Sequence, residues 1–319
     1  MAESGRAGRP LSAGNAAIPS IIEKRRPVIR TDLWRVGIVK APMAAIIAAG
    51  SLDGFEMLWL PAEGPLRFMA DPFGLWKDGL LHIFVETYDY RTRHGAIDVL
   101  ILDEKLNLLA REPALRESWH LSYPFVFEAD GAIWLLPEAY KSGRLTLYRA
   151  TEFPWRWEAE ERFVFPEAAI DATPVRTASG WRIFYTPPDP KPWRTSALKL
   201  ARADCLFGPW KVSEEAPILL DRGGARMGGT PLWQDDRLLL PTQDCRKTYG
   251  GAIAIREMRD AGDPAPQIAA GPHIAAPCAF HPYVDGLHTM SAAGPVTLVD
   301  AKRTVRSFRH LGIKIARAF

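Results

Sequence analysis

A pattern of two apolar strands joined by a Gly or Asp turn recurs five times along the chain, each time starting at a residue directly before a proline. The copies begin at positions 71, 123, 173, 230 and 281, which gives intervals of 52, 50, 57 and 51 residues. Alternating apolar residues, frequent turns and 27 prolines favour short strands over long helices. A period of about 50 residues is typical of a four-stranded blade.

Five copies predict an all-β chain folded as a five-bladed β-propeller, because a single blade cannot bury both faces and blades close radially around a channel. The fifth copy has only 39 residues up to the C-terminus, so it needs a strand from elsewhere. We expect residues 32–39 to complete that blade and close the ring. We expect third strands over 96–103, 145–150, 197–204 and 251–258. A two-layer sandwich is the alternative, and the regular period favours the propeller.

Composition places the chain among ordinary globular proteins, with 47% apolar and 24% charged residues. We expect residues 1–30 to form a flexible tail and residues 31–319 to form the propeller domain. The tail lacks the apolar core of a secretory signal. The longest apolar patch, residues 41–50, is too short to cross a bilayer, so no transmembrane segment is expected. The basic C-terminal segment from residue 303 leaves two interpretations open, a docked terminus and a membrane or partner contact.

Charge and cysteine content narrow the ligand classes. A net charge of +3 falls short of a nucleic-acid footprint, although it is compatible with an anionic small ligand. The three cysteines, Cys205, Cys245 and Cys278, lie far apart and match no metal motif. We therefore expect a cytoplasmic protein with neither a cofactor nor a bound metal.

Each repeat predicts a tight hairpin whose two ends face one another, within one position. The expected pairs are Asp71 with Glu86, Tyr123 with Glu138, Thr173 with Pro187, and Thr230 with Gln243. Because the innermost strands line the channel of a propeller, these ends should meet around one axial pocket. Carboxylates held close together raise the pKa of at least one of them, as cleavage of a glycosidic bond requires.

The candidate catalytic residues are three acids, Asp71, Glu138 and Asp171. Seven polar residues are candidates for binding the substrate: His120, Tyr123, Arg226, Gln243, Asp244, His281 and His288. For several of these residues a purely structural role is also compatible with the sequence. Asp71 and Asp171 could cap turns, the two C-terminal histidines could form ordinary hydrogen bonds, and Arg226 could lie in a solvated loop. We expect Glu86 to pair with Arg91 or Arg93 at the rim.

Several motifs together resemble one family, namely MADPF, HLSYPFVFE, LLPEA, LYRATEFPWRWE, DATPV, ARADCLFGPW and PTQDCRKTYGGAI. Over roughly residues 31–300 the chain is similar to the N-terminal domain of glucosamine inositolphosphorylceramide transferases and to its stand-alone bacterial relatives. That domain is similar in turn to the five-bladed propellers of glycoside hydrolase family 43. By this resemblance Asp71 matches the general base of the hydrolases, and Asp171 is a rough counterpart of the acid. Tyr123 stands where the hydrolases have a second Asp, and Glu138 is the other candidate acid.

We therefore expect a carbohydrate-active propeller that acts on a glycosidic bond in an acidic axial pocket, without a fused transferase domain. Two alternatives stay open. One is a non-catalytic glycan-binding or accessory domain that works with a separate glycosyltransferase. The other is a tailoring enzyme that uses the same pocket on a different small molecule, since a fold alone does not define a function.

Overall fold

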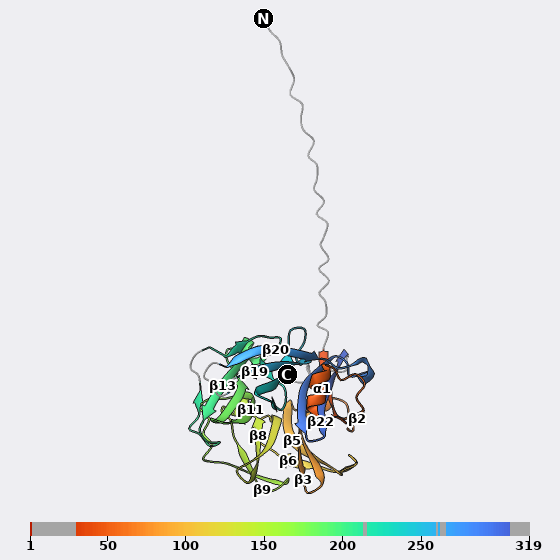
Figure 1. The fold of residues 1–319 in the computed structure, drawn as a ribbon. Coiled ribbons are helices and arrows are strands. Elements are labelled where there is room, and N and C mark those ends of the chain that lie inside the picture. Colours follow the sequence, from red (N-terminus) through yellow and green to blue (C-terminus); the bar gives the residue numbers. More distant parts are fainter. Residues whose placement is uncertain (2–29, 213–215, 260, 262–265, 307–319) are drawn as a thin grey trace.

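The structure, a computed structural model, describes residues 1, 30–212, 216–259, 261 and 266–306. Over these residues the chain forms five antiparallel sheets, which confirms the five-bladed β-propeller (Figure 1). Most of the expected tail and the end of the basic C-terminal segment lie outside the described residues. None of the helices in the described ranges is long and apolar enough to cross a membrane.

The first three blades follow the chain in order, each from an inner to an outer strand. Blade 1 contains β3 (Arg67–Lys77), β4 (Leu80–Asp89), β5 (His94–Leu102) and β6 (Leu108–Leu115). Blade 2 contains β7 (Ser122–Ala129), β8 (Ala132–Glu138), β9 (Tyr148–Glu152) and β10 (Arg156–Ala159). Blade 3 contains β11 (Ile170–Thr177), β12 (Gly180–Thr186) and β13 (Ala197–Ala203), the last of which pairs with β14 (Lys211–Val212) and β15 (Leu219–Leu220).

Blade 4 has a divided inner strand, and blade 5 joins the two ends of the described chain. In blade 4, β16 (Arg226–Met227) and β17 (Leu232–Gln234) both pair with β18 (Arg237–Asp244), and β19 (Ala252–Arg259) and β20 (Gln267–Ile274) follow. Blade 5 has the order β21 (Gly286–Ala293), β22 (Val296–Arg306), β1 (Arg30–Val39) and β2 (Met57–Trp59). Four short helices connect strands: α1 (Met43–Ala49), η1 (Tyr140–Ser142), η2 (Lys191–Thr195) and η3 (Cys278–Phe280).

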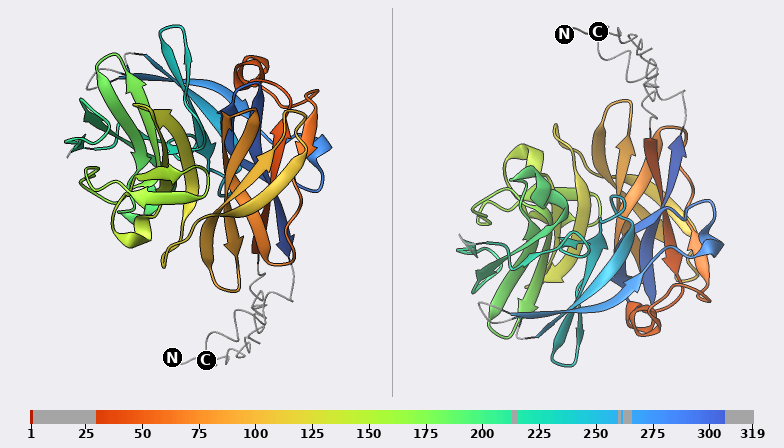
Figure 2. Two further views of the ribbon diagram at one scale, coloured as in Figure 1. Left: turned by 90° about the horizontal axis from the view of Figure 1, so that it is seen from below. Right: turned by 90° about the horizontal axis from the view of Figure 1, so that it is seen from above.

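The ring closes as the sequence predicts. β1 pairs along its whole length with β22, from Arg30 opposite Arg306 to Val39 opposite Thr297. Figure 2 shows this red-orange strand beside the blue C-terminal strands. Apolar side chains fill the spaces between the blades. The four expected third strands correspond to β5, β9, β13 and β19, which confirms that part of the prediction.

A β-bulge interrupts the inner hairpin at the same level in four blades. The register shifts between Ala70 and Phe73, between Ser122 and Phe125, between Ile170 and Thr173, and between Leu287 and Met290. Asp71, Tyr123 and Asp171 lie in three of these bulges with φ of 50°, 45° and 50°. Residues other than glycine seldom adopt this left-handed conformation, and functional sites are one of the places where strained backbone of this kind gathers.

Because of these bulges, the register of the inner hairpins differs from the one predicted. Glu86 pairs with Ala70 and Glu138 with Ser122, each one position from the expected partner and within the stated tolerance. Thr173 pairs with Phe184 instead of Pro187, so that expectation was wrong. Gln243 pairs with Arg226, because blade 4 has a divided inner strand and Thr230 falls between its two parts.

Candidate functional site

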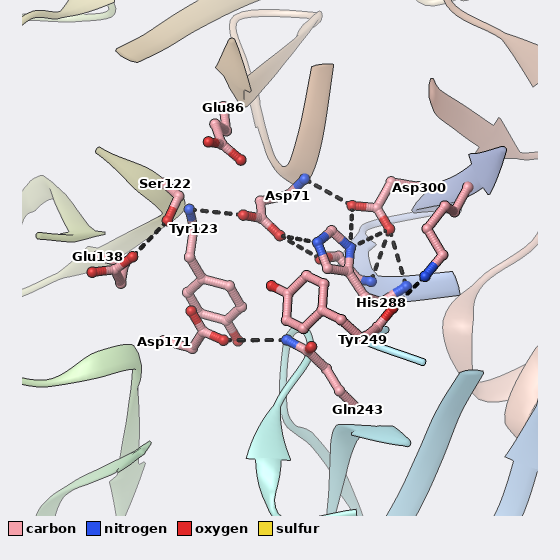
Figure 3. Close-up of polar contacts among 12 residues, drawn as sticks. Asp71, Glu86, Ser122, Tyr123, Glu138, Asp171, Gln243, Tyr249, His288 and Asp300 are labelled. Carbon is pink, nitrogen blue, oxygen red and sulfur yellow. Dashed lines mark hydrogen bonds and ion pairs between the residues drawn. The ribbon is translucent and has the colours of Figure 1, made fainter. Parts of the chain in front are cut away.

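A cavity of about 260 Å³ lies where the inner strands of several blades meet. Its polar wall includes five candidates from the sequence: Asp71, His120, Glu138, Arg226 and His288. The remaining lining residues are Asp32, Trp34, Phe68, Glu86, Tyr88, Tyr90, Ser122 and Tyr249. Figure 3 shows how the central side chains converge from different strands.

Asp71 lies at the centre of this group. Its carboxylate accepts a hydrogen bond from Thr289 Oγ1 at 2.8 Å and another from the backbone N–H of Tyr123 at 3.2 Å. Burial raises the pKa of Asp71 to about 6, although the neighbouring His288 opposes the shift. A carboxylate in this range can accept a proton near neutral pH.

His288 lies between two acids. Its Nδ1 lies 2.7 Å from Asp300 Oδ2, and its Nε2 lies 3.5 Å from Asp71 Oδ1. Burial alone would lower the pKa of His288, but the charges of Asp300 and Asp71 outweigh it and raise that pKa. Ligand atoms of these three residues lie within 4.8 Å of one another, so the group could hold a metal ion. The three residues also contact one another, since Asp300 bonds to both Asp71 and His288.

Asp300 holds this part of the site together. It is fully buried, and it accepts hydrogen bonds from the backbone N–H groups of Asp71, His288 and Thr289 at 2.9, 3.2 and 3.0 Å. Those three N–H groups belong to two bulges, one in blade 1 and one in blade 5. One carboxylate therefore fixes the relative positions of Asp71 and His288.

Glu138 ends β8 and is also buried. It accepts hydrogen bonds from Ser122 Oγ at 2.8 Å and from the backbone N–H of Tyr140 at 2.7 Å. Burial, reinforced by the negative charge of Asp171, raises the pKa of Glu138 to about 7. The consecutive residues Ser122 and Tyr123 thus contact Glu138 and Asp71 respectively, which places a second protonatable acid beside the first.

Asp171 has a different environment. Arg226 Nε donates to its Oδ2 at 2.6 Å, Arg226 Nη2 donates to its Oδ1 at 3.3 Å, and Gln243 Nε2 donates to Oδ2 at 3.2 Å. Three side-chain hydrogen bonds thus hold this carboxylate, two of them from one arginine. Arg226 lines the cavity, whereas Asp171 is not among its lining residues.

The side chain of Tyr123 has a structural role, because it connects neighbouring blades. Its hydroxyl lies 3.0 Å from Thr173 Oγ1 and accepts a hydrogen bond from the backbone N–H of Gly229 at 3.0 Å. It also donates to the carbonyl of Gly229 at 3.2 Å. The side chain is fully buried, and its contacts tie blades 2, 3 and 4 together.

Glu86 lies in the cavity wall, so its expected pairing with Arg91 or Arg93 was wrong. Arg91 pairs with Asp89 instead. Glu86 is only 6% exposed, and its carboxylate lies 3.6 Å from His120 Nε2. Burial raises the pKa of Glu86 well above its ordinary value, with further contributions from the charges of Asp71 and Glu138.

Aromatic rings form the remaining wall. The ring of Trp34 stacks on His288 with centroids 3.7 Å apart, and Tyr249 meets His288 edge-on at 5.4 Å. Lys302, which is fully buried, donates to the carbonyl of Tyr249 and to Thr248 Oγ1, and so fixes the loop that carries Tyr249. Aromatic faces of this kind stack on sugar rings.

Five sequence candidates are not among the residues that line the cavity. Tyr123, Asp171 and Gln243 bond to Asp71, Arg226 and Asp171 respectively, whereas Asp244 and His281 lie away from this group. Asp244 Oδ2 lies 2.7 Å from Arg246 Nη2 and 2.8 Å from His273 Nε2. None of these three residues lines the cavity. His281 is exposed and follows η3, five residues before β21 begins. His288 occupies the bulge of blade 5 instead, because the inner strand starts later than the proline pattern predicts.

The site residues that were not candidates from the sequence include Trp34, Tyr249 and Asp300. Asp300 had a recognisable signal, since it is an acid inside the apolar run VTLVDA, and a buried acid requires a partner. The same reasoning applies to Glu86 in LLHIFVE. No comparable pattern in the sequence marked Trp34 and Tyr249, because β1 and the loop 245–250 reach the site only through tertiary packing.

The protein is a five-bladed β-propeller with a buried acidic cavity. Some glycoside hydrolases have the same fold. An enzyme of glycoside hydrolase family 43 from Xanthomonas citri superposes with a TM-score of 0.53 at 12% identity, covering 77% of this chain and 89% of that one. An α-L-arabinofuranosidase of family 62 from Coprinopsis cinerea gives a TM-score of 0.53 at 10% identity, with 76% and 93% of the two chains covered. At such identities the likeness concerns the fold alone.

The chain belongs to the family described as glucosamine inositolphosphorylceramide transferase 1, N-terminal, whose model matches residues 57–261. This confirms the resemblance found in the sequence. A protein named glucosamine inositolphosphorylceramide transferase 1 from Oryza sativa subsp. indica is 35% identical over 242 residues, which cover 70% of this chain and 32% of the relative. The relative of that name from Arabidopsis thaliana is 32% identical over 198 residues, covering 61% and 26%. The chain thus spans about a third of the length of these curated relatives.

Proposed function

We propose that this propeller acts on the glycosidic bond of a terminal sugar bound in the axial cavity. The observation that carries this proposal is the pair Asp71 and Glu138, two buried acids that contact consecutive residues of one bulge and have raised pKa values. The small volume and the aromatic walls of the cavity favour a single sugar ring over a long polymer.

In the proposed reaction Asp71 is the general base and Glu138 the general acid. Water adds to the anomeric carbon and gives its proton to Asp71, the bond between that carbon and the glycosidic oxygen breaks, and Glu138 protonates the departing oxygen. Arg226 lines the cavity, and its ion pair with Asp171 fixes its position there. His288 and Tyr249 would position the sugar.

A proton NMR time course with aryl glycosides and oligosaccharides tests the activity. We expect new anomeric signals with the wild type, and the first anomer formed reports whether the configuration inverts. Asp71→Asn should lower turnover at least about a hundredfold while keeping the sugar affinity within a few fold, because the amide retains the shape but not the basicity. Broadened sugar lines without turnover in the wild type would contradict the catalytic proposal.

The two acids also predict a pH dependence. Asp71 must be deprotonated, which requires a pH above its pKa of about 6, and Glu138 must be protonated, which requires a pH below its pKa of about 7. We expect kcat/KM to follow a bell-shaped curve with its maximum between these values. Glu138→Gln should remove the descending limb as well as most of the activity. A profile flat from acid to alkaline pH would contradict these assignments.

A specific observation favours a second candidate, a non-catalytic glycan-binding domain that serves a separate glycosyltransferase. Tyr123 occupies an inner-strand bulge at which the resemblance implies a carboxylate, and its hydroxyl bonds only to other parts of the propeller among the described residues. The same NMR series separates the candidates. A binding domain would broaden the sugar lines equally before and after the Asp71→Asn change.

A further inference from the structure

Tyr249 has more exposed surface than the other residues of the cavity wall. It is 37% exposed, whereas Trp34, Asp71, Glu138 and His288, which line the same cavity, are each at most 6% exposed. Since all of these side chains border one space, the additional exposure of Tyr249 comes from the opening of that space to solvent. Tyr249 therefore lies at the mouth of the cavity.

The loop that carries Tyr249 is fixed by blade 5. Lys302 of β22 donates to the carbonyl of Tyr249, and the backbone N–H of Leu287 donates to the carbonyl of Gly250 at 3.0 Å. Gly250 has a φ of 57°, and a Cβ added there would lie 2.5 Å from the Cβ of His288. The loop thus lies directly against the bulge of blade 5, so that Tyr249 offers a fixed surface to a ligand.

Arg226 connects this mouth with the proposed acid. Its guanidinium carbon lies over the ring of Tyr249, 5.1 Å from the ring centroid. Its positive charge also opposes the rise in the pKa of Glu138, so it lies near that carboxyl as well. In the proposed reaction Glu138 protonates the departing oxygen. The leaving group therefore extends from Glu138 past Arg226 toward Tyr249.

Polar donors are present on this path. Arg226 Nε and Nη2 donate to Asp171, and Nη1 donates to the carbonyl of Arg194 at 3.2 Å. Among the described residues, these bonds use fewer N–H groups than a guanidinium carries. The hydroxyl of Tyr249 is a second group that can bond to a ligand hydroxyl.

The size of the cavity limits what it can enclose. Its volume of about 260 Å³ is below the roughly 300–1,000 Å³ of pockets that enclose a drug-sized ligand. A glycoside with its terminal ring in this cavity must therefore place its remaining part at the mouth. Tyr249 and Arg226 are the cavity residues that this part would contact.

We infer that Tyr249 and Arg226 form a second subsite at the cavity mouth, which binds the leaving group, and that this leaving group is a second sugar ring. The inference rests on the proposed function and names the class of the group released. A sugar ring packs its C–H groups on an aromatic side chain and bonds through its hydroxyls to the phenol and the guanidinium. An alkyl chain would leave those polar groups without a ligand partner, so we expect it to gain less.

Paired ligands test this subsite. NMR titrations compare the methyl glycosides of glucose, xylose and mannose with the methyl glycosides of their disaccharides, and with hexyl glucoside as the alkyl probe. They use the wild type and Asp71→Asn, in which the disaccharides stay intact. We expect each disaccharide to bind about tenfold more tightly than its monosaccharide, and hexyl glucoside to gain less than about threefold over methyl glucoside.

Variants of Tyr249 assign the effect to its side chain. Tyr249→Ala should reduce the gain of the disaccharide to less than about twofold, whereas Tyr249→Phe should keep most of it, because the ring remains. The matched control is Trp155→Ala. Trp155 is 40% exposed and does not line the cavity, so this change should leave the gain as in the wild type.

The outcomes separate the inference from the proposed function. Equal affinities for disaccharide and monosaccharide in the wild type would overturn the second subsite and leave the proposed function standing. An equal gain for hexyl glucoside would overturn the assignment to a sugar, and a gain that persists in Tyr249→Ala would overturn the role of Tyr249. Absence of both binding and turnover for every glycoside would overturn both proposals. The wild-type comparison decides the subsite even where Tyr249→Ala fails to fold.

Discussion

Asp300→Ala is expected to lower the free energy of unfolding by about 3 to 5 kcal/mol. Asp300 is fully buried and accepts hydrogen bonds from three backbone N–H groups and from His288. Alanine would leave those three N–H groups without an acceptor and would remove one of the two acids that stabilise the charge on His288. Because the bonded groups belong to the bulges of blades 1 and 5, we also expect Asp71 to lose its position.

Urea unfolding followed by tryptophan fluorescence measures this effect. Asp300→Asn is the matched variant, since its amide oxygen retains one acceptor while the charge is lost, and it should be destabilised by less than Asp300→Ala. A loss below about 1 kcal/mol for Asp300→Ala would show that water replaces the carboxylate and would contradict the central role of Asp300.

Arg226→Leu is expected to destabilise the protein by a similar amount, about 3 to 5 kcal/mol, because it leaves the buried charge of Asp171 without its cation. The side chain of Asp171 is 2% exposed and that of Arg226 is 13% exposed, so solvent screens the pair little. Gln243 would remain as the single side-chain donor to Asp171. Sugar binding should weaken too, since Arg226 lines the cavity.

A double-mutant cycle isolates the charge effect. Asp171→Asn combined with Arg226→Leu removes both charges, and we expect the double variant to be more stable than Arg226→Leu alone. The control is Arg237→Leu, which breaks a pair whose side chains are 30% and 29% exposed and should cost less than about 1 kcal/mol. Equal losses for Arg226→Leu and Arg237→Leu would contradict the importance of burial.

The sequence alone determined the architecture. A period near 50 residues, alternating apolar positions and a short final copy led to five blades closed by the strand before the first repeat, and β1 beside β22 confirms it. These features are visible in a sequence because every blade must bury two apolar faces and must therefore repeat the same pattern. The inner-strand position also selected Asp71, Tyr123 and Asp171, which the structure places in equivalent bulges.

Only the tertiary structure decided which polar groups meet. A bulge adds one residue to a strand and redirects the side chains around it, so the offset of Glu86 and the replacement of His281 by His288 do not follow from an alternating pattern. Whether a carboxylate has a cation beside it depends on contacts between blades and loops far apart in the chain, as with Asp171 and Arg226, 55 residues apart. The period of a strand specifies which face a side chain occupies, and packing between blades then determines its partner.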